Sequence, residues 1–124
     1  GIIVIDDAFN SNPVGARAAL DVLGAFETGK KIIVTPGMVE LGDMEEEENY
    51  KFGKEMAGVV DYAILVGPKR TEPIQKGLLE AGFASEKMII VKNLDEATAS
   101  LGQIAVPGDV VLFENDLPDS YDED

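Results

Sequence analysis

The stretch Ile-Ile-Val-Ile-Asp-Asp-Ala-Phe-Asn-Ser-Asn-Pro, residues 2–13, decides the fold class of this chain. Four consecutive apolar, mostly β-branched residues indicate a strand buried on both faces, as in a parallel sheet. Two acids end the strand, and Asn12 and Pro13 have the form of a helix start, with Asn12 as N-cap and Pro13 as the first helical residue. The stretch therefore predicts a strand that leads through a polar loop into a helix.

The same alternation continues to the end of the chain. Further apolar runs lie at residues 31–35, 62–66, 88–91 and 110–113, and helix-like stretches lie at 13–26, 44–58, 71–81 and 93–104. Asn93 and Glu96 have capping-box spacing, and Gly82 is suited to close the third helix. The order βαβαβαβαβ predicts an α/β fold, a three-layer α/β/α Rossmann-like sandwich with a mostly parallel sheet of about five strands. We expect one domain over residues 1–118 and a frayed acidic tail at 119–124.

The charge balance restricts the classes of partner. Asp and Glu number 24 against 10 for Lys and Arg, giving a net charge of -14. Because such a surface repels phosphate backbones and anionic lipid, we expect no nucleic-acid and no membrane partner. The absence of Cys and His excludes disulfides, zinc fingers, thiol nucleophiles and histidine bases, and is typical of a cytoplasmic protein. Gly1 stands directly before a strand, which predicts a domain boundary there.

Ligands of open parallel sheets bind outside the carboxyl ends of the strands. The candidate segments are therefore Asp6–Asn12, Pro36–Gly42, Gly67–Arg70, Lys92–Asn93 and Glu114–Pro118.

Each segment has a functional and a plainer interpretation. The helix amides after Asn12 could hold an anion, and Asp7 could orient a cation, a water or an amine; a capped turn with solvated acids is the alternative. Glu40 could act on a ligand or cap a neighbouring amide. Lys69 and Arg70 could bind a phosphate or carboxylate, or be solvated.

Two patterns argue against a nucleotide or metal site within the chain alone. No Walker A lysine motif and no Gly-x-Gly-x-x-Gly are present, so nucleotide binding by this chain by itself has no support. The acidic residues at 45–48 point in different directions on a helix and cannot converge on one ion. We expect no metal site and no tight ATP binding.

Two motifs resemble those of the Mur ligases. Asp6-Asp7-Ala8-Phe9-Asn10-Ser11-Asn12-Pro13 resembles the family signature Asp-Asp-x-Tyr-Asn-x-Asn-Pro. Pro36-Gly37-Met38-Val39-Glu40-Leu41-Gly42 stands where the family has Gly-Asp-Met-x-Glu-Leu-Gly. The resemblance covers nearly the whole chain, and the separation of the two motifs makes it specific to the C-terminal domain of the family.

The resemblance implies one domain of a three-domain, ADP-forming ligase of peptidoglycan precursor synthesis. ATP and Mg²⁺ would act in the full-length enzyme, with a UDP-sugar-binding domain and a central ATPase domain in the same chain. The substrate carboxylate of a UDP-muramoyl-peptide would be phosphorylated, and the amine of an amino acid or of D-alanyl-D-alanine would attack the acyl phosphate. This domain would close over ATP and position the amine, so the isolated chain would be inactive. An antiparallel strand before Gly1 is also implied; without it, the strand at 2–5 would be an exposed edge.

The residues that would contact substrate or ATP follow from the motif positions and from the strand ends. They are Asp6, Asp7, Phe9, Asn10, Asn12, Met38, Glu40, Glu114, Asn115 and Asp116.

Three departures from the family pattern bear on the substrate. Phe9 replaces the usual Tyr and loses its hydroxyl, and Gly37 stands where Asp is common. After the last strand, ligases that add D-alanyl-D-alanine usually continue Lys-Gly-Ser-Arg, whereas this chain has Glu114-Asn115-Asp116. An acidic loop repels a carboxylate and attracts an ammonium group, so a family member with a different amine donor is an alternative.

Two non-ligase interpretations remain open. A response-regulator receiver would also have paired acids after its first strand. It needs a phosphoacceptor Asp after the third strand and a Lys after the fifth, and the chain has Gly67 and Glu114 there. A scaffold without a ligand predicts that changes at Asp7 and Asn12 leave activity unaltered.

Overall fold

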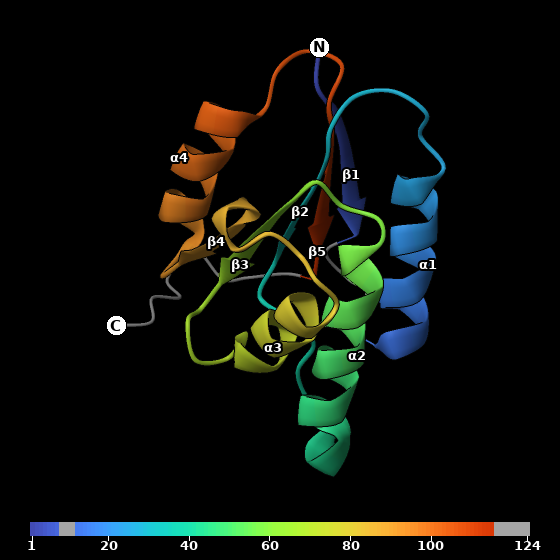
Figure 1. Cartoon of the computed structure of the whole chain (residues 1–124), viewed down its shortest axis with the longest axis vertical. Helices are drawn as coiled ribbons and strands as arrows, with labels where there is room; N and C mark the ends of the chain where they lie inside the picture. Colours follow the sequence, from blue (N-terminus) through green and yellow to red (C-terminus); the bar gives the residue numbers. More distant parts are fainter. Residues whose placement is uncertain (8–11, 116–124) are drawn as a thin grey trace.

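The computed structural model of the chain describes residues 1–7 and 12–115 (Figure 1). The predicted tail at 119–124 lies outside this part. The strands are β1 (Ile3–Asp7), β2 (Lys31–Thr35), β3 (Tyr62–Val66), β4 (Met88–Val91) and β5 (Val110–Glu114). The helices are α1 (Pro13–Gly24), α2 (Glu45–Ala57), α3 (Glu72–Glu80) and α4 (Leu94–Ile104), with short 3-10 turns at Gly42–Met44 and Ser85–Lys87. Each of these strands and α-helices begins and ends within two residues of its predicted position.

All five strands are parallel and form one sheet in the order β1-β5-β2-β3-β4. Helices α1, α2 and α3 cover one face, and α4 lies on the other (Figure 1). Helix α4 carries the chain back across the sheet, so that the last strand enters between the first two. The predicted three-layer α/β/α sandwich is confirmed.

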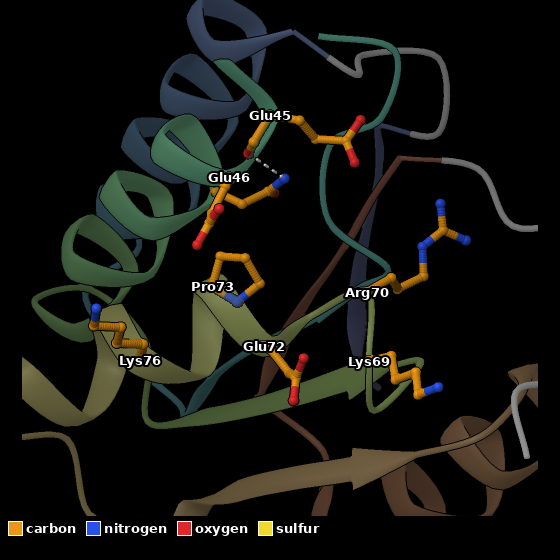
Figure 2. A pocket seen from close by; sticks show the side chains of 8 residues that line it. Glu45, Glu46, Lys69, Arg70, Glu72, Pro73 and Lys76 are labelled. Atoms are coloured by element: carbon orange, nitrogen blue, oxygen red, sulfur yellow. Dashed lines mark hydrogen bonds between the residues drawn. The ribbon is translucent and has the colours of Figure 1, made fainter. Parts of the chain in front are cut away.

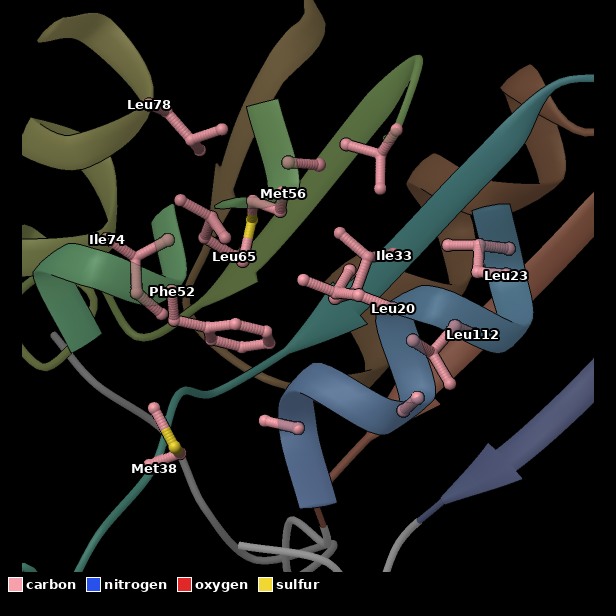
Figure 3. Packing of buried hydrophobic residues seen from close by; sticks show 14 of the residues in the cluster. Leu20, Leu23, Ile33, Met38, Phe52, Met56, Leu65, Ile74, Leu78 and Leu112 are labelled. Atoms are coloured by element: carbon pink, nitrogen blue, oxygen red, sulfur yellow. The ribbon is translucent and has the colours of Figure 1, made fainter. Parts of the chain in front are cut away.

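Two hydrophobic clusters hold the three layers together. The larger one packs Leu20 and Leu23 of α1, Phe52 and Met56 of α2, and Ile74 of α3 against the sheet (Figure 3). The smaller one packs α4 against the opposite face of β2, β3, β4 and β5. Successive residues along each central strand belong alternately to the larger and the smaller cluster, as expected of strands buried on both faces.

Asparagine caps begin two of the helices as the sequence predicts. Asn12 Oδ1 accepts a hydrogen bond from the Gly15 amide at 2.8 Å, and Pro13 is the first residue of α1. Asn93 Oδ1 accepts from the Glu96 amide at 2.9 Å, while the Glu96 carboxylate accepts from the Lys92 amide, one residue before the cap. These bonds satisfy amides that the helix itself leaves without acceptors.

Strand β1 differs from the other strands because it lies at an edge of the sheet. Its only strand neighbour among the described residues is β5, and Ile3 and Val4 are 44% and 58% exposed. The expectation that this strand is buried on both faces is therefore wrong, since the cluster beneath α4 contains no residue of β1. The implied antiparallel strand beyond β1 stays a prediction.

Asp109 connects the amino-terminal ends of three strands through hydrogen bonds and an ion pair. Its buried carboxylate accepts hydrogen bonds from the amides of Lys30 and Val106, both at 2.9 Å, and forms an ion pair with Lys30 Nζ at 2.8 Å. The bond from Lys30 is the main cause that lowers the pKa of Asp109 to about 2. Since Ile3 donates its amide to the Asp109 carbonyl, this residue joins the starts of β1, β2 and β5.

Helices α2 and α3 cross in close contact through two glycines. A Cβ at Gly77 would overlap the Tyr50 carbonyl, and a Cβ at Gly53 would overlap the Ile74 carbonyl. Neither glycine has a positive φ, so contact between the helices, rather than backbone conformation, demands a glycine here. This approach places α3 beside α2 at the edge of the sheet where the candidate site lies.

Within residues 1–7 and 12–115, no helix combines the length and the apolar character that crossing a membrane requires.

We predict that Gly77→Ala lowers the free energy of unfolding by about 1–3 kcal/mol, because the helices must separate to admit the methyl group. Gly102→Ala in α4 is the matched control: its Cβ meets nothing within 4 Å, so better helix propensity raises stability by up to about 1 kcal/mol. Urea denaturation followed by circular dichroism measures both. Equal effects of the two substitutions would contradict the close crossing.

Candidate functional site at the carboxyl edge of the sheet

Three neighbouring strands end side by side and bring together residues far apart in the sequence. Asp7 of β1 is the Cα partner of Glu114 of β5, and Thr35 of β2 lies on the other side of Glu114. Alternation along the strands directs these three side chains to the face covered by α1 and α2. The carboxyl edge of the sheet thus holds two carboxyl groups and a hydroxyl in one row.

Glu114 is the most unusual residue of this row. It is 0% exposed, and its Oε1 accepts a hydrogen bond from Thr35 Oγ1 at 2.7 Å. No described residue donates to its Oε2. Burial raises the pKa of Glu114 to about 7, the Thr35 bond opposes this, and the neighbouring charge of Asp7 adds to it. The carboxyl group therefore changes charge near neutral pH.

The loop between β2 and α2 is held from both ends. The Gly37 amide donates to Thr35 Oγ1 at 2.9 Å, and Asn115 Nδ2 donates to the Gly37 carbonyl at 2.8 Å. In α2, Asn49 Oδ1 accepts a hydrogen bond from the Met38 amide, and Asn49 Nδ2 donates one to the Met38 carbonyl. The loop is therefore tied to the same Thr35 that bonds Glu114.

Gly37, which departs from the family pattern, has a structural explanation. Its φ is 86°, and an added Cβ would lie 3.0 Å from Asn49 Oδ1 and 3.2 Å from Ile74 Cδ1. An aspartate would be strained here and would crowd the Asn49 bonds. Glycine at this position therefore preserves the loop that this chain has.

The other predicted site residues take different positions around the row. Asp6 is exposed and alternates to the opposite face of the sheet, and Asn12 uses its side chain to cap α1. Glu40 is exposed at a φ of 62°, in the left-handed region. Asn115 also has a positive φ, 66°, and bonds Gly37. Phe9, Asn10 and Asp116 lie outside the described residues.

Two site expectations are corrected. Met38, expected to contact a ligand, is 2% exposed and lies in the larger core cluster (Figure 3). Its amide and its carbonyl are both hydrogen-bonded to the side chain of the buried Asn49, which holds this residue in the core. Glu114, expected in an acidic loop after the last strand, is the last residue of β5 and is buried. Pairing of Glu114 with Asp7 of β1 extends β5 by one residue beyond its apolar run.

Sequence reasoning missed Thr35 and Asn49, which organise this edge. Thr35 ends a β-branched run and Asn49 follows four glutamates, so neither residue stands out from its segment in the sequence. Both are buried, and a polar residue within an otherwise apolar buried segment is the signal that indicates such a role, because buried polar groups need hydrogen-bond partners.

A second polar feature lies at the starts of α2 and α3. A depression of about 410 Å³ is lined by Glu45, Glu46, Asn49, Lys69, Arg70, Glu72, Pro73 and Lys76 (Figure 2). Figure 2 shows Lys69 and Arg70 on the loop after β3, across from the start of α2. This mixture of charges suits a polar ligand that carries an anionic group. Within residues 1–7 and 12–115, no group of three or more acidic side chains is arranged to hold a metal ion.

The fold and the site define a class of protein, a parallel α/β/α domain with a buried acid at the carboxyl edge of its sheet. Residues 1–114 match the family domain described as "Mur ligase, glutamate ligase domain". The chain belongs to the Mur ligase family, as its C-terminal domain.

Individual relatives agree with this membership. The chain is 30% identical over 120 residues to UDP-N-acetylmuramoyl-tripeptide--D-alanyl-D-alanine ligase of Bacillus subtilis (strain 168), covering 92% of this chain and 25% of that protein. It is similar to the MurF ligase from Thermotoga maritima in complex with ADP, with a TM-score of 0.72 and 28% identity over 94% of this chain and 25% of that one. For a MurF structure from Acinetobacter baumannii the TM-score is 0.74, with 28% identity over 93% and 25%. The chain thus spans about a quarter of the length of these relatives.

We predict that Glu114→Gln stabilises the fold at about pH 8 and not at about pH 4. The folded pKa of about 7 lies above the ordinary value of 4.5 for a glutamate, so Glu114 destabilises the fold little below pH 4.5, and stability is lost as the pH rises from 4.5 through 7. The shift corresponds to on the order of 3 kcal/mol, which the neutral amide avoids while still accepting from Thr35. Denaturation midpoints at both pH values measure this. A gain that is the same at both would contradict the raised pKa.

Proposed function

We propose that this chain is the amine-positioning domain of an ATP-dependent, ADP-forming acid–amino-acid ligase of peptidoglycan precursor synthesis. The family match over residues 1–114 is the observation that carries the proposal. The similarity to a ligase that joins D-alanyl-D-alanine to a UDP-linked tripeptide, and to a MurF structure that holds ADP, supports it. The whole enzyme would use ATP and Mg²⁺, act in the cytoplasm on a UDP-muramoyl-peptide, and contain its ATPase domain in the same chain.

The carboxyl edge of the sheet is suited to orient an amine rather than to hold phosphates by itself. Asp7 and Glu114 are acidic and repel a triphosphate, and the described residues offer no metal-binding group of three acids. We therefore assign the binding of ATP phosphates and Mg²⁺ to the rest of the full-length enzyme. Lys69 and Arg70, in the depression beside α3, are the groups of this chain suited to a carboxylate of the incoming amino acid.

Glu114 favours a second candidate, a member of the same family with an amine donor other than D-alanyl-D-alanine. A buried acid occupies the strand end at which ligases that add this dipeptide usually carry lysine. A full-length enzyme that uses D-alanyl-D-alanine with a low KM and a normal kcat would refute this candidate. Preference for another amino acid or dipeptide would support it.

We predict that Asp7→Asn lowers kcat/KM of the full-length enzyme for the amine donor by about tenfold or more, since one charge that orients the amine is lost. Asp21→Asn, on the exposed side of α1, removes the same charge away from the edge and leaves activity unchanged. Release of ADP that depends on both the UDP-muramoyl-peptide and the amine measures this. Equal activity of Asp7→Asn and wild type would favour the scaffold interpretation.

Isolated from the other domains, the 124-residue chain is expected to bind ATP weakly or not at all. Isothermal titration calorimetry of the chain with ATP and Mg²⁺ tests this assignment. Tight binding would overturn it and would move the phosphate site into this domain.

A further inference from the structure

Two described residues other than glycine have a left-handed backbone, and both lie at the carboxyl edge of the sheet. Among the residues that the structure describes, only Glu40 and Asn115 combine a side chain with a positive φ, at 62° and 66°. A residue with a Cβ is disfavoured in this region, so its neighbours must hold it there. Strain of this kind clusters at functional sites, where the surrounding structure imposes a conformation that the chain would otherwise leave.

The neighbours of Glu40 are fixed on both sides. Two residues before it, Met38 is 2% exposed, and its amide and carbonyl are both bonded to the side chain of Asn49. Directly after it, Leu41 packs against the larger core cluster, and its carbonyl accepts a hydrogen bond from the Met44 amide at 3.2 Å. Glu40 is therefore an exposed residue between two anchored positions.

The end of β5 holds the start of the same loop. Thr35 Oγ1 accepts a hydrogen bond from the Gly37 amide at 2.9 Å and donates one to Glu114 Oε1 at 2.7 Å. Because a hydroxyl has a single hydrogen, the bond to the buried Glu114 leaves the lone pairs of Thr35 for the Gly37 amide. Asn115 Nδ2 donates to the Gly37 carbonyl at 2.8 Å. Both polar groups of Gly37 are thus held, directly or through Thr35, by the end of β5.

We propose that the loop between β2 and α2 is preorganised to present Glu40 at the carboxyl edge for the ligase reaction. Thr35, Asn49 and Asn115 are its positioning residues, and Glu114 contributes by orienting the Thr35 hydroxyl. This inference rests on the proposed ligase function for the reaction that Glu40 serves. A carboxylate that is fixed before the enzyme closes loses little conformational freedom at that step, which is the benefit that offsets the backbone strain.

A purely structural role for these bonds is the competing explanation. It predicts that a substitution at a positioning residue affects activity independently of Glu40, so that the effects of the two substitutions multiply. If the positioning residues act through Glu40, their effects on activity disappear once the Glu40 carboxylate has been removed.

The first experiment uses the 124-residue chain itself and does not depend on ligase activity. A positive φ brings the amide hydrogen of a residue close to its own α-hydrogen, which gives a strong nuclear Overhauser effect (NOE) between the two. We expect Thr35→Val and Asn115→Gly each to weaken this NOE for Glu40 by about twofold or more, because the loop loses a bond that holds the strain. Glycine tolerates the positive φ at position 115, so the second variant removes only the side chain.

Two control variants accompany this measurement. Thr35→Ser keeps the hydroxyl and should retain the NOE, which separates the loss of the hydrogen bond from the loss of packing. Thr98→Val removes a hydroxyl that donates to the Leu94 carbonyl at 3.0 Å within α4, on the opposite face of the sheet, and should also leave the NOE unchanged. An unaltered Glu40 NOE in both Thr35→Val and Asn115→Gly would overturn the proposal.

The second experiment is a double-mutant cycle in the full-length enzyme, read from ADP release in the presence of the UDP-muramoyl-peptide and the amine. We expect Glu40→Gln to lower kcat/KM by about tenfold or more and Asn115→Gly to lower it by about threefold or more. The double variant should lie within about twofold of Glu40→Gln alone. Full activity of Glu40→Gln, or a double variant as low as the product of the two single effects, would overturn the proposal.

The two experiments together separate this inference from the proposed function. An active enzyme in which the two effects multiply would overturn the inference and leave the ligase function standing. A full-length protein that forms no amide bond would refute the ligase function and with it the role of Glu40 in that reaction. The NOE would then still decide whether Thr35 and Asn115 hold the loop.

Discussion

The insertion of β5 between β1 and β2 is the constraint on which the rest of the structure depends. The last strand of the chain, β5, pairs with β1 along residues 110–114 and with β2 along residues 110–113. The centre of the sheet therefore forms only when the last strand has paired with both of the first two. Asp109 fixes the start of this strand to Lys30 and Ile3, and Glu114 fixes its end to Thr35. The two core clusters then form on the two faces of the strand. Because these contacts join residues far apart in the sequence, the same step of folding stabilises the domain and forms the carboxyl edge of the sheet where the candidate site lies.

Burying an acid at the end of that strand has opposing effects. The Thr35 hydroxyl satisfies one oxygen of Glu114, and through Gly37 the same hydroxyl restrains the loop that leads to α2. The other oxygen and the nearby Asp7 charge oppose ionisation at neutral pH. A carboxyl pKa raised in this way by burial and a neighbouring charge is often found at functional sites. Asp109 shows the contrast at the opposite edge: it is also buried, but two amides and an ammonium already surround it, and its pKa falls instead of rising.

The predictions from sequence succeeded where local chemistry determines structure. Asn12 and Asn93 begin helices, Gly82 follows the end of α3 with a φ of 86°, and the apolar runs became parallel strands. They failed where the neighbours of a residue decide its environment. Ile3 and Val4 have the composition of a buried strand and are exposed at a sheet edge, and Met38 stands in a site motif and lies in the core. Thr35 and Asn49 gave no sign of their roles, because their partners are Glu114 and the backbone of a loop eleven residues away from Asn49.

The sequence by itself determined the fold class, the order of the elements and the family of this protein, since these depend on strand and helix periodicity, helix caps and two linear motifs. Only the tertiary structure decided that Glu114 belongs to β5, that it is buried beside Asp7 and Thr35, and that Asp7 lines a groove between β1 and α1. The physical reason is that periodicity and caps act between residues within one or two helical turns. The environment and the pKa of a carboxyl group depend instead on charges and burial contributed by strands that are distant in the chain.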